Sequence, residues 1–151
     1  MKRSPSSAPR TLYESEAPAL RAKPTPVVVV DCSVMGAILW VEPAAGDALA
    51  QLAVRSPHAS ALLRCELANV ARNKHRSGVP PADARASLEA FAQQQIVLHE
   101  AELCTSFDLA HRHALTAYDA AYLALALKLH APLVTFDHKL ASAARALRSA
   151  G

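Results

Sequence analysis

The segment that most restricts the fold is Val27–Val30, four consecutive β-branched residues followed immediately by Asp31. A strand that is apolar at every position is buried on both faces, which is typical of a parallel sheet covered by helices. A second apolar segment, residues 132–136, also ends at an aspartate, Asp137. The sequence therefore predicts two buried strands, each followed by an acidic residue at its carboxyl end.

The segments between these strands have mainly helical character, with breaks at proline, glycine and serine. We predict a short strand at 96–98 and helices at 33–40, 43–54, 58–76, 82–94, 102–113, 117–130 and 139–148. Strands that alternate with helices of this length predict an α/β fold with a parallel sheet and helices on both faces. Ligands of such sheets bind at the carboxyl ends of the strands.

The length and composition fit one domain with a modest core. Of the 151 residues 52% are hydrophobic, but 33 of these are alanine, which adds little apolar surface. No stretch approaches the roughly 18 apolar residues of a membrane-spanning helix, so we expect no membrane association. Three scattered cysteines, Cys32, Cys65 and Cys104, form no CxxC pair. They favour a reducing compartment, and we expect a cytoplasmic protein.

The formal net charge of +3 arises entirely from the first 26 residues. These hold five basic residues, two acidic residues and five of the ten prolines, whereas residues 27–151 hold eleven basic and eleven acidic residues. We predict that 1–26 is a disordered, proline-rich basic tail and that 27–151 is the folded domain. A start codon assigned too far upstream would explain the tail equally well. The basic pI is therefore no evidence for a nucleic-acid-binding face on the domain.

Two further acids lie on helices that are predicted to face the core. Glu66 lies beside an apolar row of the predicted long helix, where a purely structural helix would favour leucine. Asp119 is the only acid in the almost wholly apolar segment 117–127. Together with Asp31 and Asp137, these residues are four candidates for one acidic site near the carboxyl ends of the strands.

Each of the four acids also has a structural explanation. Asp31 and Asp137 can cap the helices that follow them, and Asp119 can interact with the helix dipole while Thr116 caps that helix. Glu66 can be an ordinary boundary residue paired with a basic side chain. All four coincidences would be needed together, and converging carboxylates without a basic partner repel one another. A divalent cation removes this conflict, and an all-oxygen ligand set favours Mg²⁺, with Mn²⁺ as an alternative, over zinc.

Four segments resemble, in order and spacing, the motifs of PIN-domain ribonucleases, and they are most similar to those of VapC-type toxins of type II toxin–antitoxin systems. They are VVVVDCS at 27–33, LLRCELANV at 62–70, LTAYDAAYLALA at 115–126 and PLVTFDHKL at 132–140. The resemblance extends from about Val27 to the C-terminus and implies a PIN-like three-layer α/β/α fold with a central, mainly parallel sheet. The tail, and Cys32 in place of the more usual threonine, depart from the family pattern.

The resemblance implies a Mg²⁺-dependent endoribonuclease that is the toxin of a toxin–antitoxin pair. It implies RNA as substrate, a small antitoxin that covers the site, and a homodimer. The catalytic and metal-binding residues it implies are Asp31, Glu66, Asp119 and Asp137, with Asp31 and Asp119 as principal ligands. Supporting roles are implied for Ser33, Asn69 and Thr135. The weak candidates for RNA contacts, chosen by charge, are Arg64, Arg72, Lys74, Arg76 and Lys139.

Two other functions are compatible with parts of the sequence. The first is a non-catalytic PIN-like module that binds RNA or protein, and the complete set of acids counts against it. The second is a phosphohydrolase of small substrates, which would usually need a second aspartate two residues after Asp31, where this chain has Ser33. Cleavage of RNA that depends on a divalent ion separates the ribonuclease from both alternatives.

Overall fold

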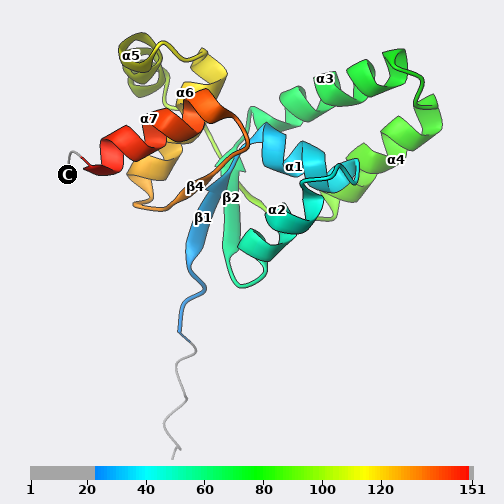
Figure 1. Ribbon diagram of the computed structural model, residues 1–151, viewed down its shortest axis with the longest axis horizontal. Helices are drawn as coiled ribbons and strands as arrows, with labels where there is room; N and C mark the ends of the chain where they lie inside the picture. The colour runs from blue at the N-terminus through cyan, green and yellow to red at the C-terminus, as the bar shows by residue number, and fades with distance from the viewer. Residues whose placement is uncertain (1–22, 150–151) are drawn as a thin grey trace, which may run out of the picture.

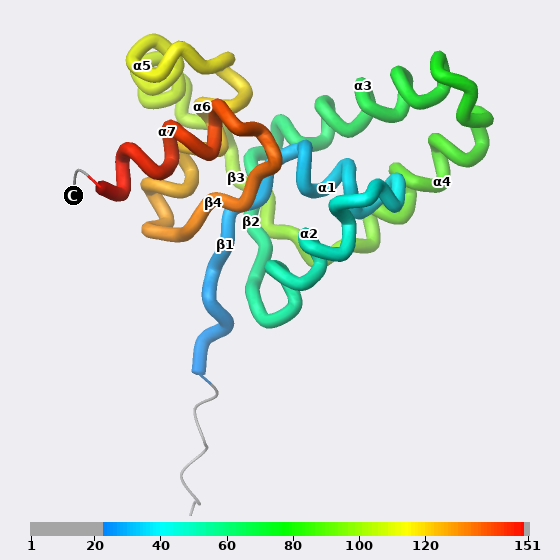
Figure 2. Tube along the Cα trace, in the orientation of Figure 1, coloured from blue at the N-terminus to red at the C-terminus, as the bar shows by residue number. Residues whose placement is uncertain are grey.

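Residues 23–149 are described by a computed structural model, shown as a ribbon in Figure 1 and as a tube in Figure 2. The elements are the strands β1 (Val27–Val30), β2 (Ser56–Ser60), β3 (Val97–His99) and β4 (Leu133–Val134), and the helices α1 (Cys32–Leu39), α2 (Ala45–Leu52), α3 (Leu63–Arg76), α4 (Pro81–Ala92), α5 (Leu103–His113), α6 (Ala117–Lys128) and α7 (His138–Ser149). Residues 1–26 were predicted to be disordered, and residues 1–22 of this segment lie outside the part of the chain that the structure describes. No helix within 23–149 has the length and apolar character needed to span a membrane.

The four strands form one sheet in the order β3–β2–β1–β4, and each neighbouring pair is parallel. Helices α1 to α4 lie to one side of this sheet and α5 to α7 to the other (Figure 1). Figure 2 shows α3 and α4 as a hairpin that projects from the sheet. The arrangement confirms the predicted three-layer α/β/α fold with a central parallel sheet, and it directs the carboxyl ends of all four strands to one edge.

The centre of the core is the contact between β1 and α6. Val28, Val29 and Val30 are completely buried, as expected for a strand that is apolar at every position. Each buried valine contributes about 1.5–3 kcal/mol relative to an exposed one. Residues 120–126 of α6 are all buried, so this helix is central, as its nearly uniform apolar sequence indicates. The contact positions the first turn of α6 close to the end of β1.

The prediction of a helix at 58–76 is wrong at its beginning. Ser56–Ser60 form strand β2, and α3 begins only at Leu63. Neither β-branched residues nor alternating polarity mark this segment as a strand, and Pro57 lacks a backbone donor. Its extended conformation depends on pairing with β1 on one side and β3 on the other, both distant in sequence. The other predicted helices and strands are present, with ends within two residues of those expected.

Candidate active site

Asp31 lies directly after β1 and is the most deeply buried of the four acids, with 4% of its surface exposed. Its Oδ1 accepts hydrogen bonds from the Ser33 hydroxyl (2.7 Å) and the Val34 backbone N–H (3.2 Å), and its Oδ2 accepts one from the Thr135 hydroxyl (2.6 Å). Burial nevertheless raises the pKa of Asp31, and the negative charge of Asp119 adds to this rise. Asp31 therefore caps α1, as predicted. Its burial, however, disfavours the negative charge of its carboxylate.

Two hydroxyls connect Asp31 to the turn between β4 and α7. The Ser33 Oγ that donates to Asp31 accepts a hydrogen bond from the Phe136 backbone N–H (2.9 Å). The Thr135 Oγ1 that donates to Asp31 accepts one from the Asp137 backbone N–H (2.9 Å). Each hydroxyl is thus oriented by a backbone donor so that its own proton points to the carboxylate. The structure places both predicted supporting hydroxyls in direct contact with Asp31.

Glu66 is half-buried on α3, and its Oε2 accepts a 2.5 Å hydrogen bond from the hydroxyl of Tyr122. Burial raises the pKa of Glu66, the Tyr122 bond lowers it, and the charges of Asp119 and Asp31 raise it further. The predicted alternative, a boundary glutamate paired with a basic side chain, is not found among the described residues. The ion pairs there are Lys74–Glu42, Arg85–Glu89 and Lys128–Glu102.

Asp119 lies in the first turn of α6 and is half-buried. Its backbone N–H donates to Thr116 Oγ1 (3.1 Å), so Thr116 is the predicted cap of this helix. The Thr116 hydroxyl in turn donates to Asp119 Oδ2 (2.7 Å). The helix dipole also favours a carboxylate at this position. Because its charge raises the pKa of both Asp31 and Glu66, Asp119 completes one shared negative centre.

Asp137 and Asn69 are less closely connected to this centre. Asp137 is exposed, and its Oδ1 accepts a 2.7 Å hydrogen bond from the Leu140 backbone N–H, which makes it the cap of α7. It is linked to Asp31 through Thr135, which bonds to both residues. Asn69 is exposed, one turn after Glu66 on α3. The structure thus brings together three of the four acids and places the fourth next to them through a shared hydroxyl.

The chemistry of the donors fits a hard divalent cation. All of them are carboxylate oxygens, none of the four acids takes part in an ion pair within residues 23–149, and burial disfavours the negative charge of two of them. In the same part of the chain, no three acidic, histidine or cysteine side chains already have the arrangement of a metal site. Instead, separate hydroxyl groups donate hydrogen bonds to the carboxylates of Asp31, Glu66 and Asp119.

The basic candidates differ in their distance from the acidic centre. Arg64 and Lys139 are exposed and lie two residues from Glu66 and Asp137, respectively. The other three occur later on α3, which rises about 1.5 Å per residue away from Glu66. Lys74 donates to Glu42 at 2.7 Å, so its charge is neutralised within the domain. The remaining two are Arg72 and Arg76.

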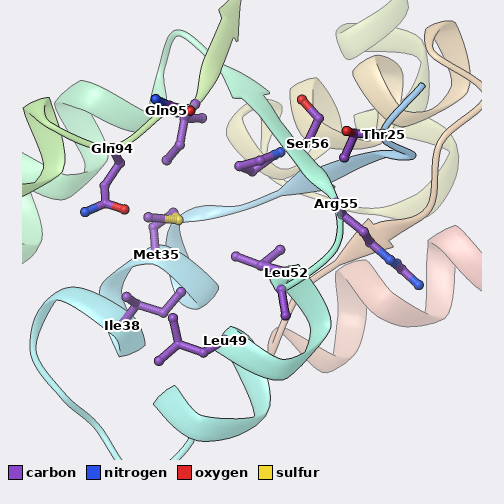
Figure 3. Close-up of a pocket in the computed structure, with 12 residues that line it drawn as sticks. Thr25, Met35, Ile38, Leu49, Leu52, Arg55, Ser56, Gln94 and Gln95 are labelled. Carbon is purple, nitrogen blue, oxygen red and sulfur yellow. The ribbon is translucent and has the colours of Figure 1, made fainter. Parts of the chain in front are cut away.

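A pocket of about 470 Å³ lies apart from the acids, between β2, α1 and α2 (Figure 3). Thr25 and Ser56, at the amino ends of β1 and β2, belong to its lining. Apolar side chains from the two helices, including Met35, Ile38 and Leu49, form another part, and residues 94–96, which precede β3, also contribute. None of the four acids lines it. The acidic centre therefore lies towards the opposite ends of the strands from this pocket.

Tyr122 is a contact of the acidic centre that the sequence motifs do not single out as functional. It lies three residues after Asp119, on the same side of α6, and is 1% exposed. The sequence contained one indication of this contact, namely a tyrosine in an otherwise apolar helix. A buried tyrosine hydroxyl requires a hydrogen-bond partner, so such a residue points to a polar group nearby. That partner, Glu66, belongs to a helix 56 residues away in the sequence.

Cys32, which follows Asp31, is half-buried beside the acids. Burial, followed by the charges of Glu66 and Asp31, raises the pKa of its thiol to about 12. Because the thiolate is the reactive species, we expect iodoacetamide at pH 8 to alkylate Cys32 at least about a hundredfold more slowly than the exposed Cys65 and Cys104. Peptide mass spectrometry of the metal-free protein measures the three rates. Equal rates would contradict the partial burial of this thiol near the two carboxylates.

The burial of Asp31 also predicts how the stability of the metal-free protein depends on pH. Its pKa is raised on folding, so the folded state binds this proton more tightly than the unfolded chain does. The contribution of Asp31 to stability is therefore complete in acid and is lost as the pH rises from about 4 through the folded-state pKa. Asp31→Asn removes this loss, so its free energy of unfolding minus that of the parent should increase between pH 4 and pH 8.

Urea unfolding in the presence of a chelator measures this difference. The pKa of His58 is lowered by burial and by neighbouring His99, which destabilises the protein in acid, but both proteins share this effect and it cancels. A difference that decreases with rising pH would contradict the prediction.

Comparison with known proteins shows the family to which the chain belongs. A family model for the PIN domain matches residues 28–146. Ribonuclease VapC3 of Pyrobaculum aerophilum is 31% identical over 120 residues, which cover 76% of this chain and 92% of that protein. The crystal structure of PAE2754, from the same organism, has a TM-score of 0.64 at 22% identity and covers 89% of this chain and 95% of its own.

The crystal structure of Mycobacterium tuberculosis VapC20, described as a sarcin–ricin loop cleaving toxin, has a TM-score of 0.58 at 14% identity. The match covers 77% of this chain and 94% of VapC20. The two crystal structures resemble this chain in fold, whereas the family model and the 31% identical relative match it in sequence. The chain therefore belongs to the PIN-domain family and, within it, to the VapC-type ribonucleases.

Proposed function

We propose that the protein is a Mg²⁺-dependent endoribonuclease that hydrolyses phosphodiester bonds of RNA, with Mn²⁺ able to replace Mg²⁺. The observation that carries this proposal is the shared negative centre of Asp31, Glu66 and Asp119, which has no Lys or Arg ion-pair partner within residues 23–149. Membership of the PIN family and similarity to a relative named as a ribonuclease support RNA as the substrate.

In this proposal the four carboxylates have different roles, which follow from their surroundings. Asp31 and Asp119 are the principal ligands, and Glu66 and Asp137 act through bound water. When bound, Mg²⁺ stabilises the charge on the scissile phosphate and lowers the pKa of a bound water. Glu66 orients the attacking water and accepts its proton, for which a carboxylate with a raised pKa is suited.

Substrate contacts and orientation fall to the surrounding residues. Ser33 and Thr135 hold the Asp31 carboxylate in one orientation through their hydroxyls. Arg64 and Lys139, the exposed basic residues next to the acids in sequence, bind the phosphates on either side of the cleaved bond. Phosphate contacts of this kind attract the RNA to an otherwise acidic centre, and the affinity should decrease as the salt concentration increases.

We further propose that the protein is the toxin of a toxin–antitoxin pair in the cytoplasm, inhibited by a small antitoxin and assembled as a homodimer. Apolar side chains that are exposed in the single chain support contacts with other proteins, namely Leu49 beside the pocket and Leu103 and Phe107 on α5. The structural neighbour VapC20 is described as a toxin, and the relative VapC3 carries a name of the same VapC series. Co-expression with the product of a small adjacent reading frame tests the antitoxin, and light scattering tests the dimer.

Incubation of the protein with RNA in Mg²⁺, followed by mapping of the RNA ends, tests the main proposal. A ribonuclease yields new internal ends that accumulate with time. A non-catalytic binding module retards the RNA in a gel but leaves it intact, and a phosphohydrolase releases phosphate from small esters without cutting RNA. Either of the last two results would contradict the proposal, because each assigns the acids a different role.

A further inference from the structure

Tyr122 combines deep burial with a polar contact to the acidic centre. It is the largest of the fully buried side chains, at the middle of the core helix α6. Phenylalanine would fill this space equally well, and the phenol adds only a hydroxyl that must be satisfied away from water. That hydroxyl donates to Glu66 Oε2 rather than to a backbone carbonyl. Its placement therefore concerns Glu66 and not only the packing of the core.

The hydrogen bond restricts a side chain that would otherwise be free to rotate. Glu66 has three rotatable bonds and is only half-buried, and the ion pairs within residues 23–149 do not include it. The bond engages Oε2 and leaves Oε1 available to the site. Since Tyr122 is immobilised by the core, its donor provides a rigid reference point for the carboxylate.

The same helix also supplies Asp119, one turn before Tyr122. The carboxylate of Asp119 and the hydroxyl that orients Glu66 therefore move together with α6. Through Tyr122, the position of Glu66 on α3 is fixed relative to Asp119 on α6 without a direct hydrogen bond between the two acids. A tyrosine needed only for packing would not require its hydroxyl to point at the one acidic residue of α3.

We propose that Tyr122 is a positioning residue, whose hydroxyl holds the Glu66 carboxylate in the orientation needed by the divalent cation. The inference rests on the proposed metal-dependent activity and extends it to a residue outside the set of acids. Tyr122 touches neither the RNA nor the cation in this role, and it acts only through Glu66.

Binding of Mn²⁺ to the full chain, followed by electron paramagnetic resonance, tests the proposal without relying on activity. Tyr122→Phe removes only the hydroxyl, and we expect the dissociation constant for Mn²⁺ to rise about ten- to a hundredfold. Tyr118→Phe is the matched control, because Tyr118 lies on the same helix but is 55% exposed. Its Mn²⁺ affinity should equal that of the parent.

A second comparison separates positioning from a structural role. In a Glu66→Ala background, Tyr122→Phe should produce no further loss of Mn²⁺ affinity, because the residue through which it acts is already absent. The proposal would be overturned if the two substitutions reduced Mn²⁺ affinity independently, so that their effects multiplied in the double variant. It would also be overturned if Tyr122→Phe alone left the affinity unchanged. Should Tyr122→Phe fail to fold, Glu66→Asp withdraws the carboxylate from the hydroxyl while the core stays intact. Undiminished Mn²⁺ binding by that variant would also overturn it.

The parent protein distinguishes this inference from the proposed function. If the parent binds no Mn²⁺ and its RNA cleavage does not require a divalent ion, the metal-dependent function is wrong, and the positioning role with it. If the parent binds Mn²⁺ and Tyr122→Phe binds it equally well, the function stands and only the role of Tyr122 is wrong.

Discussion

Asp31→Asn is expected to reduce the rate of RNA cleavage at least about a thousandfold, which corresponds to about 4 kcal/mol of transition-state stabilisation. The substitution keeps the shape of the side chain and an oxygen that can accept the hydrogen bond from Val34, so α1 keeps its cap. It removes the negative charge at the most buried position of the acidic centre. Asp119→Asn should have a similar effect, because Asp119 is the other principal ligand in the proposed mechanism.

Asp108→Asn is the matched control for both variants. Asp108 is exposed on α5 and belongs to no part of the acidic centre, so the same chemical change there should leave the cleavage rate unaltered. Circular dichroism and thermal unfolding show whether each variant retains the fold. If Asp31→Asn and Asp119→Asn cut RNA as fast as the parent, the acidic centre is not the catalytic site.

Removal of divalent ions should abolish cleavage by the parent protein, and addition of Mg²⁺ or Mn²⁺ should restore it. The physical reason is the repulsion between Asp31, Glu66 and Asp119, which basic residues do not offset by ion pairs within 23–149. A cation that binds the folded state also stabilises it, by about 1.4 kcal/mol at a free concentration ten times its dissociation constant. A chelator titration of the cleavage rate and thermal unfolding with and without Mg²⁺ measure the two effects.

The two measurements should change together in the variants. Asp31→Asn should lose the Mg²⁺-dependent increase in unfolding temperature, whereas Asp108→Asn should keep it. Cleavage that persists at the parent rate in excess chelator would rule out the metal-dependent mechanism. Stabilisation by Mg²⁺ that is unaffected by Asp31→Asn would place the cation elsewhere on the protein.

Much of the fold could be predicted because the strongest elements carry their own signals. The four valines of β1 predict a buried strand, and the apolar segment of α6 predicts a core helix. Each segment contains too few polar residues to form a solvent-exposed surface. Strand β2 could not be predicted in this way. Its residues, Ser56–Ser60, have no intrinsic preference for a strand, and only pairing with β1 and β3 makes them extended.

The acidic site shows a similar division. The positions of Asp31 and Asp137 after two apolar strands predicted that they would lie near one edge of the sheet, and the structure links them through Thr135. The same reasoning could not rank the acids. Asp31 is buried and bonded by two hydroxyls, whereas Asp137 is exposed and caps α7, a difference set by how the β4–α7 turn packs against β1.

The local pattern of residues was sufficient to select the side chains of the candidate site, because strand ends and helix faces follow from short-range periodicity. How these side chains are held depends on contacts between segments far apart in the chain. Thr135 donates a hydrogen bond to Asp31, and Tyr122 donates one to Glu66, across 104 and 56 residues respectively. Such contacts form only when strands and helices have packed, since a hydrogen bond requires both partners within about 3 Å and no periodic pattern encodes that distance.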